Sequence, residues 1–390
     1  MRAIRMFGFA AVGFYAMFEK FMAKQPPEKE LTEFLRLLPK TETHLHIEGA
    51  LPWELLQQLD PAQFAKHPPA WQEEFRFESF AAFEKQLLEM AFFWYTSPER
   101  YHEAAKLIFK RHLDLNVRYV ETSFASGVIE FLGLDGQAVL QAIRAAVPHG
   151  LEVRVFLGIH HNGYNSRTSS IIDSACSWED LAGFDLHGDE TLPLEPWSKN
   201  LWRHAREAGK YNKVHAGELL GADFVKQVVM DLRPHRIEHG IRAAEDPDVV
   251  ALLRDRNIAL DVCPLSNLKL RVCPDMASHP LPHLEAGGVR CTISTDDPLM
   301  FGNSIIDEYQ ALSKHLGYAR TDLIRLIRNG WAVALIDDAI RQEYFCEIGR
   351  LADVQAQQRV LNHAGESFMP RGIGLSPQSH REKHNREASN

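Results

Sequence analysis

Short apolar runs alternate with amphipathic segments along most of the chain, and this alternation predicts the fold. Eight runs have the length and apolar character of strands buried on both faces: 41–47, 117–124, 152–159, 181–186, 213–216, 236–239, 258–262 and 289–294. Between many of them apolar residues recur with helical spacing, as in 136–146, 199–208, 247–254 and 276–285. Eight strand–helix units in succession predict an α/β fold, a (β/α)8 TIM barrel.

The connection after the first predicted strand is the longest and the richest in aromatic residues. Residues 51–105 therefore predict a helical insertion, in which Phe80, Phe83 and Leu87 can form an apolar lid that excludes water. After the eighth strand, helical spacing returns at 305–314 and 320–334. No internal repeat or second domain is evident, so we expect one barrel domain over residues 28–370.

The two ends of the chain differ from this pattern. The basic start Met1–Arg5 precedes an apolar run at 6–18, which predicts that residues 1–27 are a leader-like or disordered extension. The run is too short to span a bilayer, and no convincing cleavage site follows it. Residues 371–390 are polar and predict a disordered tail. We expect a cytoplasmic protein, although the leader-like start leaves export open.

Composition and charge narrow the class of protein. Hydrophobic residues make up 45% and charged residues 24%, as in soluble globular enzymes. Asp and Glu outnumber Lys and Arg by 52 to 43, and this acidic balance argues against a nucleic-acid or membrane partner. The five cysteines are odd in number and form no C-x-x-C, which disfavours a disulfide framework and fits a reducing compartment. The oligomeric state stays open.

Polar residues with metal-binding side chains stand at the ends of several predicted strands. His44 and His46 are two residues apart, so both point to the same side of one strand. His215 and Asp296 end two other strands, and a barrel builds its active site where the carboxyl ends of its strands meet. Three imidazoles and one carboxylate suit one Zn²⁺ ion that activates water, although iron, cobalt and manganese accept the same ligands.

Four further residues are candidates for proton transfer or substrate binding beside such a metal. Glu218 lies in the loop after the third histidine, where its carboxyl group can deliver a proton to a ring nitrogen. His239 ends the sixth strand and can orient an attacking hydroxide, a task that it would share with Asp296. Asp297 points away from its neighbour and can face the substrate, and Gly188 lets a substrate approach the backbone closely.

The blocks that contain these residues resemble the adenosine deaminase family of metal-dependent (β/α)8 hydrolases. They are H-L-H-I-E-G at 44–49, D-L-H-G-D-E at 185–190, H-A-G-E at 215–218, R-I-E-H-G at 236–240 and S-T-D-D-P at 294–298. Their order and spacing are specific, and the similarity runs from about Leu38 to Lys314. The resemblance implies an enzyme, a hydrolase that removes the 6-amino group of a purine by breaking the C–N bond of a cyclic amidine.

The resemblance also implies a role for each matching residue. The implied zinc ligands are His44, His46, His215 and Asp296. Glu218 would protonate N1 of the purine, and His239 with Asp296 would steer the hydroxide toward C6. Asp297 would accept a hydrogen bond from N7, and the backbone of Gly188 would meet N3. Glu48 stands where adenosine-acting relatives often carry an Asp that reaches the ribose, so it is a candidate substrate-binding residue.

The motifs point to more than one 6-aminopurine. The blocks at 188–190 and 297–301 are similar to those of nucleoside-acting members, and they favour adenosine or 2′-deoxyadenosine as the substrate. Glu48 and the block at 263–270 are similar to those of adenine deaminases, and aminodeoxyfutalosine deaminases can also carry this Glu. Adenine-specific members usually have an F-F-D-P-Q segment after the second strand, which residues 121–125 lack. We therefore expect adenosine first, with adenine and aminodeoxyfutalosine as alternatives.

Other classes of protein fit the sequence less well. A second design of zinc deaminase needs P-C-x-x-C after H-x-E, and no P-C-x-x-C occurs. The H-E-x-x-H motif of metallopeptidases is also absent, because Lys106 stands where His102-Glu103 would need a second histidine. A non-catalytic purine-binding relative would be free to lose Glu218 or Asp296, and both are present.

Overall fold

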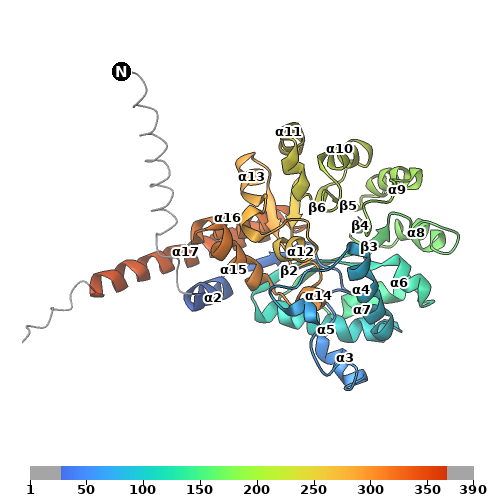
Figure 1. Cartoon of the computed structure of the whole chain (residues 1–390), viewed down its shortest axis with the longest axis horizontal. Helices are drawn as coiled ribbons and strands as arrows, with labels where there is room; N and C mark the ends of the chain where they lie inside the picture. Colours follow the sequence, from blue (N-terminus) through green and yellow to red (C-terminus); the bar gives the residue numbers. More distant parts are fainter. Residues whose placement is uncertain (1–27, 367–390) are drawn as a thin grey trace, which may run out of the picture.

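The computed structural model describes residues 28–366, and their strands form a parallel barrel surrounded by helices (Figure 1). The strands are β1 (Lys40–Glu42), β2 (Val117–Ala125), β3 (Glu152–His160), β4 (Gly183–His187), β5 (Tyr211–Ala216), β6 (Arg236–His239), β7 (Ala259–Val262) and β8 (Cys291–Ile293). Each pairs in parallel with the next, in the order β1 to β8. The predicted TIM barrel is confirmed, and each predicted strand segment overlaps one of the strands.

Helices connect the strands and cover the outside of the barrel. Up to β4 they are α2 (Glu28–Leu37), α3 (Trp53–Leu59), the 3-10 helix η1 (Pro69–Trp71), α4 (Phe80–Trp94), α5 (Pro98–Asp114), α6 (Ser126–Phe131), α7 (Gly136–Ala145) and α8 (Ser169–Ala175). After β4 they are α9 (Pro196–Glu207), α10 (Ala222–Asp231), η2 (Ile241–Glu245), α11 (Pro247–Asp255), α12 (Pro264–Lys269), η3 (Met276–Ser278), α13 (Leu281–Ala286), α14 (Pro298–Phe301), α15 (Ile305–Leu316), α16 (Arg320–Val333) and α17 (Asp338–Glu366).

The barrel interior is ionic beneath the carboxyl ends of its strands. On β5 and β6, alternate residues point inward, which places Lys213 and Arg236 inside the barrel. The Lys213 ammonium lies 2.6 Å from Glu238, and the Arg236 guanidinium pairs with Glu121 and, at 3.1 Å, with Asp261. All five side chains are buried. Buried charges need partners of opposite sign, so this network constrains how the strands align.

The seam between β8 and β1 is not a regular ladder, and the prediction of one strand over 41–47 is wrong beyond Glu42. There the chain makes isolated contacts: the His46 N–H donates to the Asp296 carbonyl and the Asp296 N–H to the His44 carbonyl, both at 3.3 Å. The Ser294 hydroxyl accepts the N–H groups of Thr43 and His44 at 3.0 and 3.1 Å. A side-chain acceptor thus takes the place of strand carbonyls, which breaks the ladder pattern.

The predicted helix over 276–285 is also wrong, because it is divided into η3 and α13. Pro280 stands between the two and has no N–H to continue a helix. A proline also disfavours helical geometry in the residue before it, and His279 accordingly has φ −59° and ψ 130°.

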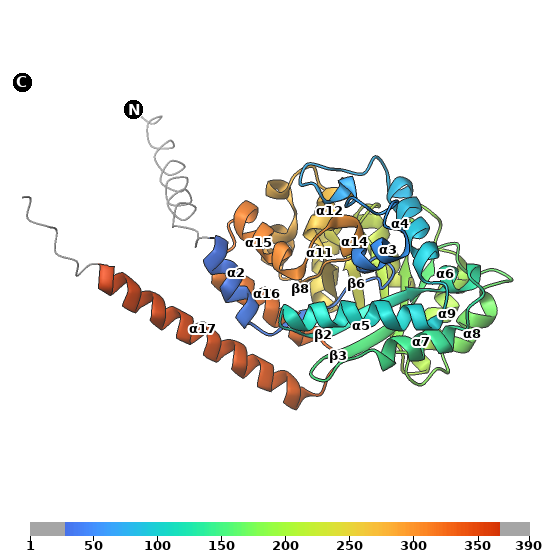
Figure 2. The same ribbon diagram turned by 90° about the horizontal axis from the view of Figure 1, so that it is seen from below.

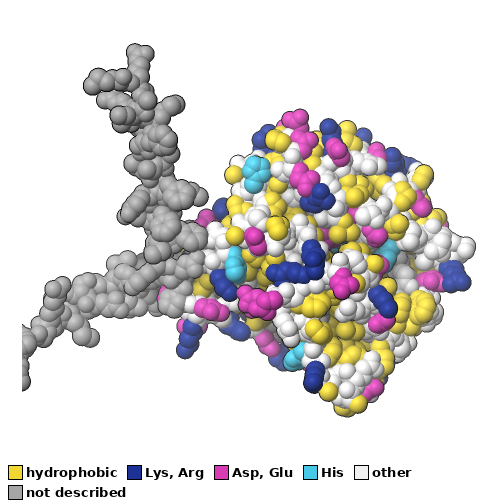
Figure 3. Space-filling model, viewed as in Figure 1, with side chains coloured by type: hydrophobic (Ala, Val, Ile, Leu, Met, Phe, Trp, Pro, Cys, Tyr) yellow, Lys and Arg dark blue, Asp and Glu magenta, His cyan; other side chains and the backbone are white. Residues whose placement is uncertain are grey.

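Helix α4 and its flanking segments lie between β1 and β2 in sequence, and α4 contributes Phe80, Phe83 and Leu87 to a cavity at the barrel mouth. Helix α17 extends away from the barrel (Figure 2). Within residues 28–366 no helix has both the length and the apolar character needed to cross a bilayer. Acidic and basic side chains are interspersed on the face seen in Figure 3. The predicted extension at 1–27 and the tail at 371–390 lie outside the described residues.

A matched pair of glycine substitutions tests the packing of α16 on the barrel. A Cβ at Gly330 would lie 2.0 Å from the Thr41 hydroxyl of β1, whereas one at Gly127 in α6 meets nothing within 4 Å. Gly330→Ala should lower the free energy of unfolding by about 1–3 kcal/mol through overpacking. Gly127→Ala should leave it unchanged or raise it by up to about 1 kcal/mol through helix propensity. Urea denaturation followed by circular dichroism measures both, and equal stabilities would contradict this packing.

Candidate metal-dependent active site

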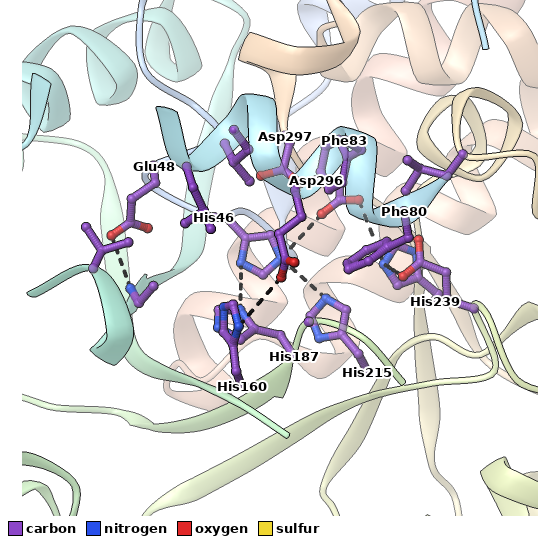
Figure 4. Close-up of a pocket in the computed structure, with 18 residues that line it drawn as sticks. His46, Glu48, Phe80, Phe83, His160, His187, His215, His239, Asp296 and Asp297 are labelled. Atoms are coloured by element: carbon purple, nitrogen blue, oxygen red, sulfur yellow. Dashed lines mark hydrogen bonds and ion pairs between the residues drawn. The ribbon is translucent and has the colours of Figure 1, made fainter. Parts of the chain in front are cut away.

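Four side chains predicted as metal ligands, His44, His46, His215 and Asp296, converge at the carboxyl ends of the strands. Figure 4 shows His46, His215 and Asp296 in the cavity there. His46 Nε2 lies 3.3 Å from the Nε2 atoms of both His44 and His215. Asp296 Oδ1 lies 3.2 Å from His44 Nε2 and 3.4 Å from His46 Nε2. His44, His215 and Asp296 are almost completely buried, and His46 is nearly so. The structure therefore brings together residues that are up to 252 positions apart in the sequence.

The spacing of these four atoms fits a divalent cation. A regular tetrahedron with edges of about 3.3 Å has its centre about 2.0 Å from each corner, which is the usual Zn–N distance. Burial opposes a charge on His46, yet Asp297, Asp296 and Asp185 raise its pKa to about 9. The site thus has surplus negative charge, which a metal ion can neutralise in place of ring protons. His239 offers a further nitrogen close to His44, His215 and Asp296. Its Nε2 atom lies 3.8 Å from Asp296 Oδ2, the carboxylate oxygen that does not face His44 and His46.

Second partners orient each predicted ligand. The Nδ1 atom of His215 lies 3.1 Å from Asp185 Oδ1 and 3.0 Å from Glu238 Oε2, and His46 Nδ1 lies 2.9 Å from the Ser123 hydroxyl. Such acceptors hold the ring proton on Nδ1 and leave the Nε2 lone pair for a metal. Sequence reasoning missed these partners. The sequence did contain a signal for Asp185 and Glu238: polar residues alternate along β4 and β6, which places them on the inner face of the barrel.

Glu218 lies beside the four ligands and is held by a second buried carboxylate. Glu190 accepts the backbone N–H groups of Glu218, Leu219 and Leu220 at 3.1, 3.0 and 2.9 Å. Burial, and then the charges of Asp296 and Glu190, raise the pKa of Glu218 well above its usual value. Its Oε1 atom is buried and has no hydrogen-bond partner among the described residues. Glu218 can therefore hold a proton that it donates to a ligand. The sequence did not indicate the role of Glu190.

Two catalytic candidates have strained backbones. His239 and Asp296 have φ values of 59° and 67°, in the left-handed region that residues other than glycine rarely adopt. Such strain persists only where surrounding contacts impose it, and it is common at active sites. Burial lowers the pKa of His239 well below its ordinary value, so this ring is neutral.

The predicted substrate-facing residues surround the same cavity. Asp297 keeps a buried Oδ1 without a hydrogen-bond partner in the described part of the chain. A Cβ at Gly49 would lie 1.6 Å from this oxygen, which explains the glycine that ends the first block. Gly188 has φ +86°, a conformation suited to glycine. Glu48 lines the cavity too, but its Oε1 already accepts from the Tyr101 hydroxyl and the Ala125 N–H, at 2.9 and 3.1 Å.

The cavity itself is small and closed on one side by α4. Its volume is about 70 Å³, below the roughly 300–1,000 Å³ of common ligand sites, so α4 or its side chains must move to admit a larger molecule. His160 and His187 line it as well, although the sequence did not single them out. None of the described residues that line it is Lys or Arg. The cavity therefore suits an uncharged ligand with polar edges rather than an anion.

Comparisons with known proteins agree with this architecture. A family model described as adenosine deaminase matches residues 39–350. Adenine deaminases of Sinorhizobium fredii and Rhizobium meliloti are each 32% identical to this chain, covering 78% of it and 96% and 97% of their own lengths. The crystal structure of adenine deaminase from Arthrobacter aurescens has a TM-score of 0.72 at 25% identity, over 81% of this chain and 99% of that one. An amidohydrolase from Burkholderia ambifaria with bound zinc has a TM-score of 0.73 at 22% identity, over 86% and 96%.

Asp185→Asn tests the metal site without removing a ligand. The amide is a weaker acceptor for the His215 ring proton, so zinc affinity should fall about 10- to 100-fold. Competition with a chromophoric chelator measures the dissociation constant. Asp189→Asn is the matched control, because the hydrogen bonds of the Asp189 carboxylate in the described structure are those of a local turn with Thr191. Equal zinc affinity in the two variants would contradict the orienting role of Asp185.

Proposed function

Because the chain belongs to the adenosine deaminase family, whose members hydrolyse C–N bonds of cyclic amidines, we propose that it deaminates a 6-aminopurine with one zinc ion. The observation that carries this proposal is the buried cluster of His44, His46, His215 and Asp296 beside Glu218, in which four distances between possible ligand atoms are 3.2–3.4 Å. A carboxyl group that holds a proton next to a metal site is what hydrolysis of a ring amidine requires.

Adenine is the substrate that we propose, with hypoxanthine and ammonia as products. The sequence motifs favoured adenosine, but the similar curated proteins and the Arthrobacter aurescens structure named above are adenine deaminases, which supports the alternative better. The small cavity agrees with a free base. Its lack of Lys and Arg also disfavours AMP, because phosphate recognition normally relies on cationic side chains or backbone N–H groups.

The side chains of this protein divide the reaction between them. When bound, the cation would lower the pKa of a water molecule toward neutrality and so supply hydroxide. Asp296 and His239 would hold the attacking oxygen near C6, while Glu218 donates its proton to N1 as the C6–O bond forms. The C6–N bond of the tetrahedral intermediate would then break as its C6 hydroxyl becomes a carbonyl. The amino group would leave as ammonia with the proton that the attacking water lost to Asp296, and the hydroxyl proton would return to Glu218.

Asp297 and Gly188 would orient the purine for this attack. The free Oδ1 of Asp297 would meet N7, and the contact needs one shared proton, since a carboxylate and an unprotonated N7 are both acceptors. The backbone of Gly188 would meet N3, where the absence of a side chain allows a close approach.

Adenosine stays the second candidate because of a specific feature of the site. Residues 188–190 are similar to the block of nucleoside-acting relatives, and Glu190 of this block holds the loop that carries Glu218. A nucleoside would require α4 to move away from the cavity.

A substrate panel tests the proposed function. Spectrophotometric assays on adenine, adenosine, 2′-deoxyadenosine, AMP and aminodeoxyfutalosine should give the highest kcat/KM for adenine and none for AMP. Removal of metal with a chelator should abolish activity, and added zinc should restore it. Activity that survives in protein shown by elemental analysis to be metal-free would refute the metal-dependent mechanism. A higher kcat/KM for adenosine would make adenosine, not adenine, the substrate.

Glu218→Gln tests the proton donor. The amide cannot supply a proton to N1, so kcat should fall by about 10²- to 10⁴-fold while zinc content stays near one per chain. Glu89→Gln, at an exposed position of α4, provides a control with the same chemical change. Turnover near that of the control would remove Glu218 from the mechanism.

A further inference from the structure

The block at 263–267 contributes two side chains that touch the active site without facing the cavity. The Ser266 hydroxyl donates to Asp296 Oδ2 at 2.7 Å, and the Asn267 side chain lies 3.1 Å from His239 Nδ1. We propose that Asn267 and His279 are positioning residues, which fix the tautomer of His239 with its proton on Nε2. This inference deepens the function proposed above and rests on it for its catalytic consequence.

The first step locates the ring proton of His279. This step does not depend on which way the Asn267 amide is turned. The backbone N–H of Leu281 lies 3.2 Å from His279 Nδ1, and a backbone N–H can only donate. The Nδ1 atom therefore carries a lone pair. Burial lowers the pKa of His279 to about 4, so the ring is neutral near pH 7. Its single proton is then on Nε2.

The second step orients Asn267. Its Oδ1 lies 3.3 Å from His279 Nε2. Because that nitrogen carries the proton, the atom opposite must be an acceptor, and the amide oxygen occupies this place. The amide nitrogen then faces His239. The two ends of an Asn side chain look alike in most structures, and here the hydrogen-bond network decides between them.

The third step reaches the catalytic histidine. Asn267 Nδ2 donates to His239 Nδ1, which must therefore hold a lone pair, so the proton of the neutral ring lies on Nε2. This atom is 3.5 Å from Glu218 Oε2 and 3.8 Å from Asp296 Oδ2. His239 thus presents a hydrogen-bond donor to the reaction. It can stabilise the attacking oxygen, whereas a carboxylate such as Asp296 must accept the proton that water loses.

The fold holds this relay in place. Asn267 is fully buried on α12, where its N–H donates to the Cys263 carbonyl at 2.9 Å and its carbonyl accepts from Val272 at 2.8 Å. His279 is 2% exposed and follows η3, at the point where Pro280 interrupts the helical segment. The break that the periodicity did not predict therefore gives His279 the extended backbone from which it reaches Asn267.

Asn267→Asp tests the relay with a side chain of the same shape. A carboxylate can only accept, so it should draw the His239 proton to Nδ1 and leave Nε2 without a donor. In a serine-protease triad the wrong histidine tautomer lowers kcat about 10⁴-fold; here we expect a fall of about 10²- to 10⁴-fold in kcat, with smaller changes in KM and zinc content.

Nuclear magnetic resonance of the zinc-loaded enzyme with ¹⁵N-labelled histidine reads the tautomer directly. Two-bond ¹H–¹⁵N spectra should show His239 protonated on Nε2 in the wild type and on Nδ1 in Asn267→Asp, with the signal assigned by its loss in His239→Gln. A wild-type ring protonated on Nδ1, or an Asn267→Asp variant with unchanged tautomer and kcat, overturns the proposal. An enzyme inactive on every purine would refute the proposed function, yet these spectra would still test the relay.

His279 supplies a second test if Asn267→Asp does not fold. His279→Phe removes the donor to Asn267 Oδ1, so the amide can turn and kcat should fall by about tenfold, one hydrogen bond's worth. His279→Gln can donate again and should recover most of this loss. His283→Phe, at an exposed position of α13, is the control. Equal kcat in all of these variants would contradict the role of His279. A fall in activity no larger than the fall in the fraction of folded protein would contradict it too.

Discussion

The barrel closes through residues of its proposed active site, and the rest of that site depends on this closure. Between β8 and β1 the main-chain contacts join Asp296 to His44 and His46, each at 3.3 Å. Three of the four proposed metal ligands are thus held together by the hydrogen bonds that complete the barrel. Separating them would leave buried N–H and C=O groups of the seam without partners, and each such group costs about 1–3 kcal/mol. Fold and site are stabilised by the same contacts.

Charge is the second constraint on the fold. The barrel interior below the site is filled by charged side chains and not by branched apolar ones. Lys213 and Arg236 neutralise carboxylates on neighbouring strands, and Glu238 links this network to His215. In a medium of low polarity each of these groups requires its partner, so a shift of one strand would leave charges unpaired. The network therefore favours a single strand alignment, and this alignment carries the third histidine to the other two.

Proton positions connect the geometry to chemistry. Acceptors such as Ser123 and Asp185 hold protons on Nδ1 and leave Nε2 lone pairs turned toward one point. Beside these lone pairs, Glu218 and His239 would offer protons to the place where a purine would lie. Lone pairs for a cation and hydrogen-bond donors for a substrate thus border the same cavity of about 70 Å³. Hydrolysis of a ring amidine needs both, because water must lose a proton while the ring nitrogen gains one.

The sequence alone determined the parallel barrel and the residues that gather at its mouth, because apolar periodicity and the placement of His44, His215 and Asp296 at strand ends are local properties. The family followed from the resemblance of its motif blocks. The tertiary structure decided what depends on contacts between distant segments. The seam beyond Glu42 follows from the Ser294 hydroxyl, and the partners of His215 and Glu218 follow from strand alignment and loop packing. The helix break at Pro280 was visible as a proline, but its use, bringing His279 to Asn267, was not. Hydrogen bonds between side chains depend on distances and directions in space, which spacing along a chain does not encode.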